Sequence, residues 1–277
     1  MATTLDHAML ARPYRIIRWP SPALAALLMA LTAACGGDSG QTPTQPRILP
    51  PPFEGAGDVG PDVITTTDST TLSSVTSLGR GMRLMHDDRV QDTATVNAHL
   101  FEALFADGFT TQLQVNPEMD STTALAEAEQ YAHILGQMPS SLRSAVDTVW
   151  VQGGEGDWWA IWWRGTLLLH LDFGDELLGV GLAEEIMLHE MSHMGLEEQL
   201  DTTAAWAAAQ AADGRFITDY AAEFPDSEDM AESFVAWVSV RYRADRLPAG
   251  VLSTIEATIP NRLAFFDGLG LDLDPIR

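Results

Sequence analysis

Residues 182–194 read LAEEIMLHEMSHM, and this stretch is the most informative part of the 277-residue chain. Its opening residues are good helix formers, and Gly195 suits a helix end. The sequence therefore predicts a helix over 182–194. On such a helix His189 and His193, four residues apart, lie one above the other on the same face. Both imidazoles can then reach one metal ion.

An acidic residue sits between the two histidines. Glu190 lies about 100° round the helix from His189, close enough to touch a metal-activated water. A carboxylate in that place can take a proton from the water and later pass it to a leaving group. The pattern indicates a zinc-dependent hydrolase, and the alternative is a pair of incidental histidines on an amphipathic helix.

A catalytic zinc ion needs a third protein ligand and one open position. Residues 228–234 read EDMAESF and start a second predicted helix, on which Glu228 and Glu232 share one face. One of the two glutamates can complete the metal site while the other hydrogen-bonds a ligand imidazole. The alternative is an ordinary solvated acidic face.

The two helices together resemble the gluzincin branch of the zincin metallopeptidases, which includes lethal-factor-like catalytic domains. The resemblance implies a zincin-like fold, bound Zn²⁺ and a peptide or protein substrate. It also implies that Glu228 is the third ligand and that Glu232 supports a ligand histidine. Tyr220 matches the tyrosine that stabilises the oxyanion in lethal-factor-like proteins.

Residues 189–243 also resemble a group of largely uncharacterised bacterial lipoproteins. They share with this group an Ala-rich helix, Ala-Asp-Gly, Tyr-Ala and Glu-Asp-x-Ala-Glu-Ser-Phe, and residues 114–118 (QVNPE) match an earlier motif. After the second histidine the group often has Thr-Ser-Leu-Asp, whereas this chain has MGLE at 194–197. We therefore expect the surroundings of the second histidine to differ.

The charge of the chain excludes one class of partner. There are 39 acidic residues against 15 basic ones, all of them arginine, and the net charge is −24. Nucleic-acid phosphates would be repelled by such a surface, so no nucleic-acid partner is expected. The single cysteine, Cys35, excludes an intramolecular disulfide and a cysteine-based zinc site.

The N-terminal residues have the pattern of a targeting signal. Basic residues precede a short apolar run at 22–34, which is too short to span a bilayer. Residues 31–35 (LTAAC) resemble a bacterial lipobox, in which cleavage exposes the cysteine for lipid attachment. An ordinary secretory signal is the alternative. We expect a lipoprotein signal peptide over 1–34, a disordered Pro/Gly-rich tether over 35–62, and one metallohydrolase domain over 63–277.

Within that domain the patterns predict an α+β fold, a small mixed sheet followed by a helical half. Asp107-Gly108 predicts a hairpin between 96–105 and 109–115, and 121–136 reads as a helix. Strands are expected at 148–151 and within 158–173, and further helices at 201–212, 227–242 and 250–258. Residues 65–77 fit either more tether or a first edge strand.

Two other features leave alternatives open. Trp158, Trp159, Trp162 and Trp163 cannot all face one side of a strand, so either the strand is covered on both faces or some indoles are exposed for recognition. His170 precedes the metal-binding helix on a predicted strand. A structural role is favoured for it over a role in the substrate pocket.

The sequence therefore predicts a zinc metallopeptidase of the bacterial cell envelope, held to a membrane by a lipid at Cys35 and facing the periplasm or the outer surface. Its predicted ligands are His189, His193 and Glu228. The alternatives are a non-catalytic metal-binding envelope lipoprotein and a cell-wall amidase that uses the same site.

Overall fold

The computed structural model describes residues 49–55, 59–87, 89–90, 92–161, 165–197, 200 and 203–277. They lie in one compact unit, Arg47–Arg277. The expected signal peptide, Cys35 and the first part of the expected tether lie outside the described residues. Among the described helices none has the length and apolarity needed to cross a membrane.

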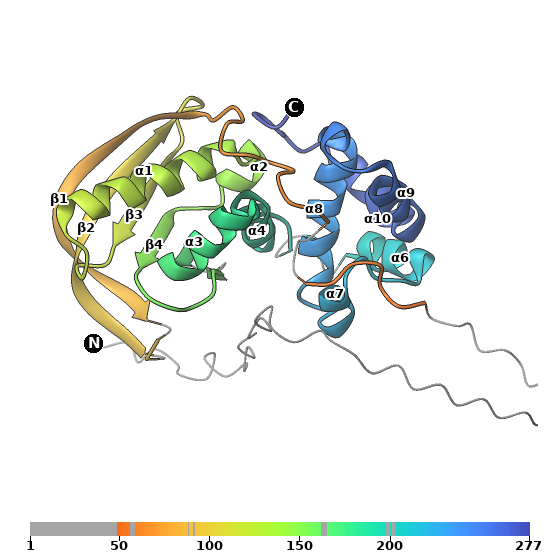
Figure 1. Cartoon of the computed structure of the whole chain (residues 1–277), viewed down its shortest axis with the longest axis horizontal. Helices are drawn as coiled ribbons and strands as arrows, with labels where there is room; N and C mark the ends of the chain where they lie inside the picture. The colour runs from red at the N-terminus through yellow and green to blue at the C-terminus, as the bar shows by residue number, and fades with distance from the viewer. Residues whose placement is uncertain are drawn as a thin grey trace, which may run out of the picture. The chain divides into compact units, whose positions relative to one another are not determined.

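Six strands form one mixed sheet in the order β1-β2-β3-β4-β6-β5. The strands β1 (Leu72–Asp87), β2 (Asp92–Phe105) and β3 (Thr110–Val115) are antiparallel neighbours. The next two, β4 (Thr148–Gln152) and β6 (Thr166–His170), run parallel to β3, and β5 (Trp159–Ile161) is antiparallel at the far edge. The first helix, α1 (Ser121–Gln137), connects β3 to β4 and lies across β1, β2 and β3 (Figure 1).

The strands β4 and β6 are buried on both faces, as their nearly continuous apolar sequences predict. In β4, Val149 and Val151 join the main core while Trp150 joins a smaller cluster on the opposite face. In β6, Leu167 and Leu169 face the main core while Leu168 faces the smaller cluster.

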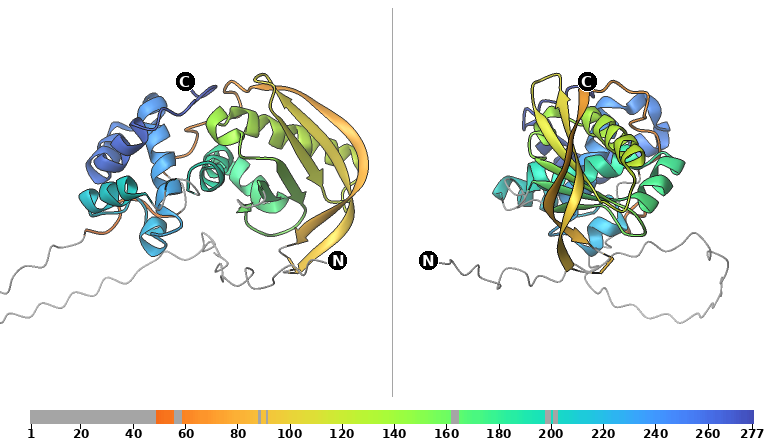
Figure 2. Two further views of the ribbon diagram at one scale, coloured as in Figure 1. Left: turned by 180° about the vertical axis from the view of Figure 1, so that it is seen from behind. Right: turned by 90° about the vertical axis from the view of Figure 1, so that its left-hand side faces the viewer.

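The chain is almost entirely helical after β6. The helices are α3 (Leu171–Val180), α4 (Ala183–Ser192), a π-helix η3 (His193–Glu197), α6 (Ala204–Asp213), α7 (Asp219–Glu223), α8 (Asp229–Tyr242), a 3₁₀ turn η4 (Ala244–Arg246), α9 (Ala249–Thr258) and α10 (Pro260–Asp267). A short α2 (Ser140–Arg143) precedes β4. Figure 2 shows α9 and α10 beyond α8, on the side away from the sheet. The expectation of an α+β fold is confirmed.

The expected hairpin at Asp107-Gly108 and the helix beginning at Ser121 are both present. Gly108 has a φ of 85°, which suits a glycine in this turn, and Asp120 caps α1 by accepting from the backbone N–H groups of Thr122 and Thr123. The ambiguous segment 65–77 contains the start of β1, a 16-residue edge strand. The sequence did not predict α3, α7 or α10.

The predicted tether needs a correction, because its described part is folded onto the domain. We call the described residues from 49 to 71 the N-terminal strap. Phe53 forms a parallel bridge with Thr218, donating its N–H to the carbonyl of Ile217 and accepting from the N–H of Asp219. Val59 is only 3% exposed. The folded unit therefore begins before residue 63, because these apolar side chains have a surface to pack against.

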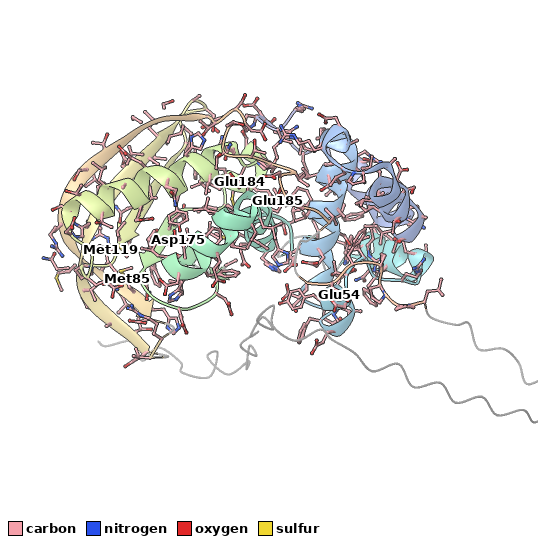
Figure 3. The ribbon with its side chains drawn as sticks, viewed as in Figure 1. Glu54, Met85, Met119, Asp175, Glu184 and Glu185 are labelled. Carbon is pink, nitrogen blue, oxygen red and sulfur yellow. The ribbon has the colours of Figure 1, made fainter. Side chains whose placement is uncertain are left out.

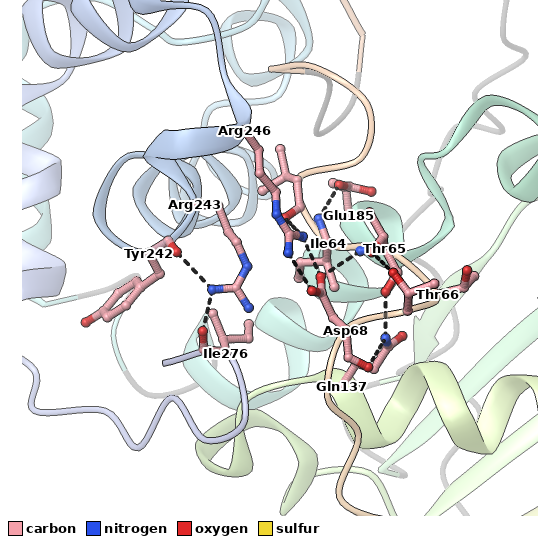
Figure 4. Close-up of polar contacts among 12 residues, drawn as sticks. Ile64, Thr65, Thr66, Asp68, Gln137, Glu185, Tyr242, Arg243, Arg246 and Ile276 are labelled. Atoms are coloured by element: carbon pink, nitrogen blue, oxygen red, sulfur yellow. Dashed lines mark hydrogen bonds and ion pairs between the residues drawn. The ribbon is translucent and has the colours of Figure 1, made fainter.

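The strap joins the sheet to the helical half. Gln137 at the end of α1 donates to the carbonyls of Thr65 and Asp68, and Arg246 pairs with the Asp68 carboxylate and donates to the carbonyl of Val63 (Figure 4). Ile64 is buried and donates its N–H to Glu185 on α4 at 2.9 Å. The strap thus fixes the start of the helix that carries the histidine motif.

Candidate metal centre

Helix α4 is buried along nearly its whole length. Glu184 and Glu185, labelled in Figure 3, lie buried in its first turn. His189 is 3% exposed, and its Nε2 lies 3.1 Å from Nε2 of His193 one turn later. The two rings therefore present one nitrogen each to the same point, as the four-residue spacing predicts.

Glu228 comes to this point from a distant part of the sequence. It is the residue immediately before α8, and its N–H donates to the carbonyl of Phe224 at 2.8 Å. Its Oε2 lies 3.3 Å from Nε2 of His189 and 3.4 Å from Nε2 of His193. One oxygen and two nitrogens, from the residue before α8, from α4 and from η3, thus form a small triangle.

The triangle has the dimensions of three corners of a zinc tetrahedron. Zinc–nitrogen bonds of about 2.0–2.1 Å at tetrahedral angles place neighbouring ligand atoms about 3.3 Å apart. The three separations here are 3.1, 3.3 and 3.4 Å. Glu190 also has a carboxylate oxygen within 4.8 Å of the histidine nitrogens. The donor set therefore fits zinc, and the Glu190 carboxylate lies close to it.

Each imidazole also has a carboxylate on its far side. Oε1 of Glu232, one turn along α8 from Glu228, lies 2.9 Å from Nδ1 of His189. Oε2 of Glu197 lies 2.7 Å from Nδ1 of His193. Such contacts hold a ring with its other nitrogen facing the metal. Sequence reasoning placed Glu232 here but missed Glu197, although the four-residue spacing from His193 was a usable signal.

The helix does not end at Gly195 as the sequence suggested. It continues from Ser192 into the π-helix His193–Glu197, and Met194 and Leu196 are buried. A Cβ at Gly195 would lie 2.7 Å from a methyl carbon of Leu142 on α2. The glycine is therefore needed for close packing against α2, not as a helix terminator.

Glu190, between the two histidines in the sequence, has a carboxylate oxygen within 4.8 Å of a nitrogen on each of them. Burial raises the pKa of its carboxyl, while the two histidines and a hydrogen bond from the backbone of Ala160 on β5 partly oppose the shift. A carboxyl with a raised pKa suits a role in which it must both accept and donate a proton.

Tyr220 lies on α7, with its ring centroid 6.4 Å from that of His189. Burial and the charges of Glu228 and Glu190 raise the pKa of Tyr220 above its usual value. The hydroxyl is therefore protonated, and a hydrogen bond to Glu228 contributes to the raised pKa. The strap contributes to its placement, because Phe53 and Gly55 hold Asp219 directly before it.

The surrounding carboxylates raise the pKa of both histidines. Burial opposes protonation of His189, but hydrogen bonds to Glu228 and Glu232 outweigh it and raise its pKa to about 10. Burial likewise opposes protonation of His193, yet the charge of Glu197 and its hydrogen bond raise that pKa well above the usual value. Glu228 is buried too, but the two imidazoles hold its pKa well below its usual range.

The other residues considered from the sequence lie elsewhere or outside the description. His170 is fully buried at the end of β6, and its carbonyl accepts from Nε1 of Trp158 at 3.1 Å. Its strand lies between β4 and β5, so it is not an edge strand. Trp158 is buried between Tyr131 and Phe173, whereas Trp162 and Trp163 lie outside the described residues.

Comparisons of the chain with protein-family models, with curated proteins and with solved structures gave no match.

Proposed function

We propose that this chain is a zinc-dependent metallopeptidase with a zincin-like fold and the ligands His189, His193 and Glu228. The triangle of their three donor atoms carries the proposal, because its sides match those of a zinc tetrahedron. A carboxylate oxygen of Glu190 lies within 4.8 Å of the two histidines, which supports a role for it beside the metal.

A bound zinc ion supplies Lewis acidity, which polarises a carbonyl and lowers the pKa of a water molecule. Glu190 takes a proton from the attacking water at its carboxylate and passes it to the leaving amine. Tyr220 donates from its hydroxyl to the carbonyl oxygen as negative charge develops there. Glu232 holds His189 in place through Nδ1.

The position of β5 supports a peptide as substrate. This strand is at the edge of the described sheet, and its residue Ala160 hydrogen-bonds to Glu190. An extended peptide can add to such an edge through main-chain hydrogen bonds. A backbone carbonyl of the bound peptide would then lie close to Glu190, the residue that activates the water. A cell-wall amidase would use the same residues on a different amide.

We also propose that the domain is attached to a membrane of the bacterial envelope through a lipid on Cys35. The basic residues, apolar run and small residues before that cysteine support the assignment. Expression in a bacterial host with radiolabelled palmitate checks it. Label in the wild type and none in Cys35→Ser is expected, and equal labelling of both would contradict a lipid at Cys35.

Metal analysis with two matched variants tests the catalytic proposal. The purified wild type is expected to hold one zinc ion per chain, as three ligands and an open position imply. Glu228→Gln is expected to lose the metal, and Glu190→Gln is expected to keep it while losing cleavage of peptides in a library screen. The exposed Glu223→Gln on α7 serves as the control.

The same experiment separates catalysis from a purely structural metal. If Glu190 is a fourth ligand in a closed structural site, Glu190→Gln will lose zinc as Glu228→Gln does. A wild type that binds no stoichiometric zinc would remove the whole assignment.

A further inference from the structure

The contact between Glu197 and His193 is the feature of this centre that the proposed mechanism does not use. We propose that Glu197 is a positioning residue that fixes the ring of His193 so that its Nε2 faces the metal. This inference rests on the proposed zinc site and deepens it, because it assigns each ligand histidine its own carboxylate.

The contact is short and sheltered. Oε2 of Glu197 lies 2.7 Å from Nδ1 of His193, and the two side chains are only 16% and 14% exposed. An exposed ion pair one helical turn apart contributes a few tenths of a kcal/mol and is easily screened. Here the carboxylate has given up most of its hydration, which a surface ion pair does not require.

The second carboxylate oxygen of Glu197 has also lost its hydration. Oε1 of Glu197 is buried, and none of the described residues forms a hydrogen bond with it. A buried carboxylate with half of its acceptors unsatisfied lowers stability. The chain tolerates that cost at a residue whose one strong contact is with a ligand of the candidate metal site.

The backbone holds Glu197 in this position by packing. Met194 and Leu196 are buried anchors of the π-helix, and Gly195 allows it to approach Leu142 closely. A π-turn within a helix is rare and frequently marks a functional site. The residues 194–197, where this chain has MGLE and the lipoproteins that it resembles often have Thr-Ser-Leu-Asp, thus act as one unit that ends on Glu197.

Each of the two histidines has its own carboxylate close to Nδ1. His189 has Glu232 at Nδ1 and His193 has Glu197 at Nδ1, while both Nε2 atoms face Glu228. A carboxylate at Nδ1 fixes the tautomer and makes the opposite nitrogen a better ligand. Removal of Glu197 therefore weakens zinc binding at one of the two histidines without removing a ligand.

The test measures zinc affinity by competition with a chromophoric chelator, using wild type, Glu197→Gln, Glu197→Ala and the exposed control Glu176→Gln on α3. We expect about 10-fold weaker binding for Gln, which keeps an acceptor, and about 100-fold weaker binding for Ala. The control is expected to bind as wild type does. Equal affinity in all four proteins would overturn the proposal.

Two further measurements keep the result specific. The unfolding temperature of the metal-free variants should stay close to that of wild type. A clearly lower temperature would mean that a damaged fold, and not the loss of the Glu197 contact, weakens zinc binding. Ring-nitrogen NMR of the metal-free protein should show a hydrogen-bonded Nδ1 proton on His193 that is lost in Glu197→Ala.

The NMR result also separates the two proposals. If wild type binds no zinc, the proposed function fails. The positioning role is still tested, because the Nδ1 proton of His193 is measured in the metal-free protein. An Nδ1 proton that is unchanged in Glu197→Ala would overturn the positioning role whatever the metal content.

Discussion

The guanidinium of Arg262 on α10 donates from Nε to Oδ2 of Asp229 at 2.9 Å, and both side chains are essentially buried. Asp229 directly follows Glu228. The same guanidinium pairs with Asp213 at the end of α6, and Gln210 also donates to Asp229. The start of α8 is therefore tied to two other helices, and this network holds Glu228 opposite the histidines. Asp213 and Asp229 belong to the Ala-Asp-Gly and Glu-Asp motifs of the sequence.

Breaking this buried network should destabilise the whole helical half. Arg262→Met leaves Asp213 and Asp229 without their cation, so we expect a loss of about 3–5 kcal/mol in the free energy of unfolding. Urea denaturation of the metal-free protein measures it. The half-exposed pair Arg241–Asp267 is the control, and Arg241→Met should cost no more than about 1 kcal/mol. Equal losses in the two variants would contradict this account of α8.

Zinc binding should release protons at neutral pH. In the metal-free protein His189 has a pKa of about 10, and that of His193 is also well above its usual value. Both rings must lose a proton to bind zinc, so we expect about two protons released per ion, and weaker binding as the pH falls. Calorimetry in buffers of different ionisation enthalpy measures the number. Binding without proton release at pH 7 would show that the rings are already neutral.

Glu185 should make the protein less stable as the pH rises. Burial raises its pKa from 4.5 to about 8, and hydrogen bonds from the strap only partly oppose the shift. The folded state therefore holds a proton that the unfolded state has lost between these values. Its contribution to stability is fully present below about pH 4.5 and is lost as the pH rises to about 8.

Glu185→Gln tests this sign. Glutamine keeps an acceptor for the N–H of Ile64 but cannot ionise (Figure 4). The variant should gain stability relative to wild type between pH 5 and pH 8, by on the order of 1.4 kcal/mol for each unit of pKa shift that is realised. Chemical denaturation across this range measures the difference. A constant difference would mean that Glu185 ionises in the folded state as it does in water.

Tyr220→Phe should lower the turnover number without releasing the metal. The hydroxyl is expected to act only on the developing oxyanion, and loss of such a donor typically costs about 100-fold to 1,000-fold in kcat. Steady-state kinetics on a peptide found in the library screen, with zinc content measured in parallel, checks both parts. Tyr242→Phe is the matched control, because Tyr242 packs edge-on against Trp237 away from the histidines.

A chain shortened to begin at residue 63 should be less stable than one that begins at residue 47. The shorter chain lacks Phe53 and Val59, which pack against the core. Their burial is worth roughly 3 kcal/mol together, at about 1.5 kcal/mol or more for each side chain. Thermal unfolding of the two chains measures the difference. Equal unfolding temperatures would support the domain boundary at residue 63 that the sequence suggested.

Much of the site was predictable because it depends on local geometry. The four-residue spacing places His189 above His193 on any helix, and the same rule relates Glu228 to Glu232. Glu197 obeys this rule too, but a glutamate one turn from a histidine is common in an acidic chain, so the sequence alone did not single it out. The hairpin at Asp107-Gly108 and the cap at Asp120 were predictable for similar reasons, since turn and cap preferences act over a few residues.

The sequence by itself therefore determined the helix of the histidine motif, the helix that follows Glu228, the pairing of residues one turn apart, and the α+β order of elements. Only the tertiary structure decided that Oε2 of Glu228 reaches both histidines, that Arg262 fastens the helix behind it, and that the strap packs onto the domain. The physical reason is distance along the chain. Positions within one helix follow from its repeat, whereas contacts between segments dozens of residues apart depend on how whole apolar faces pack together.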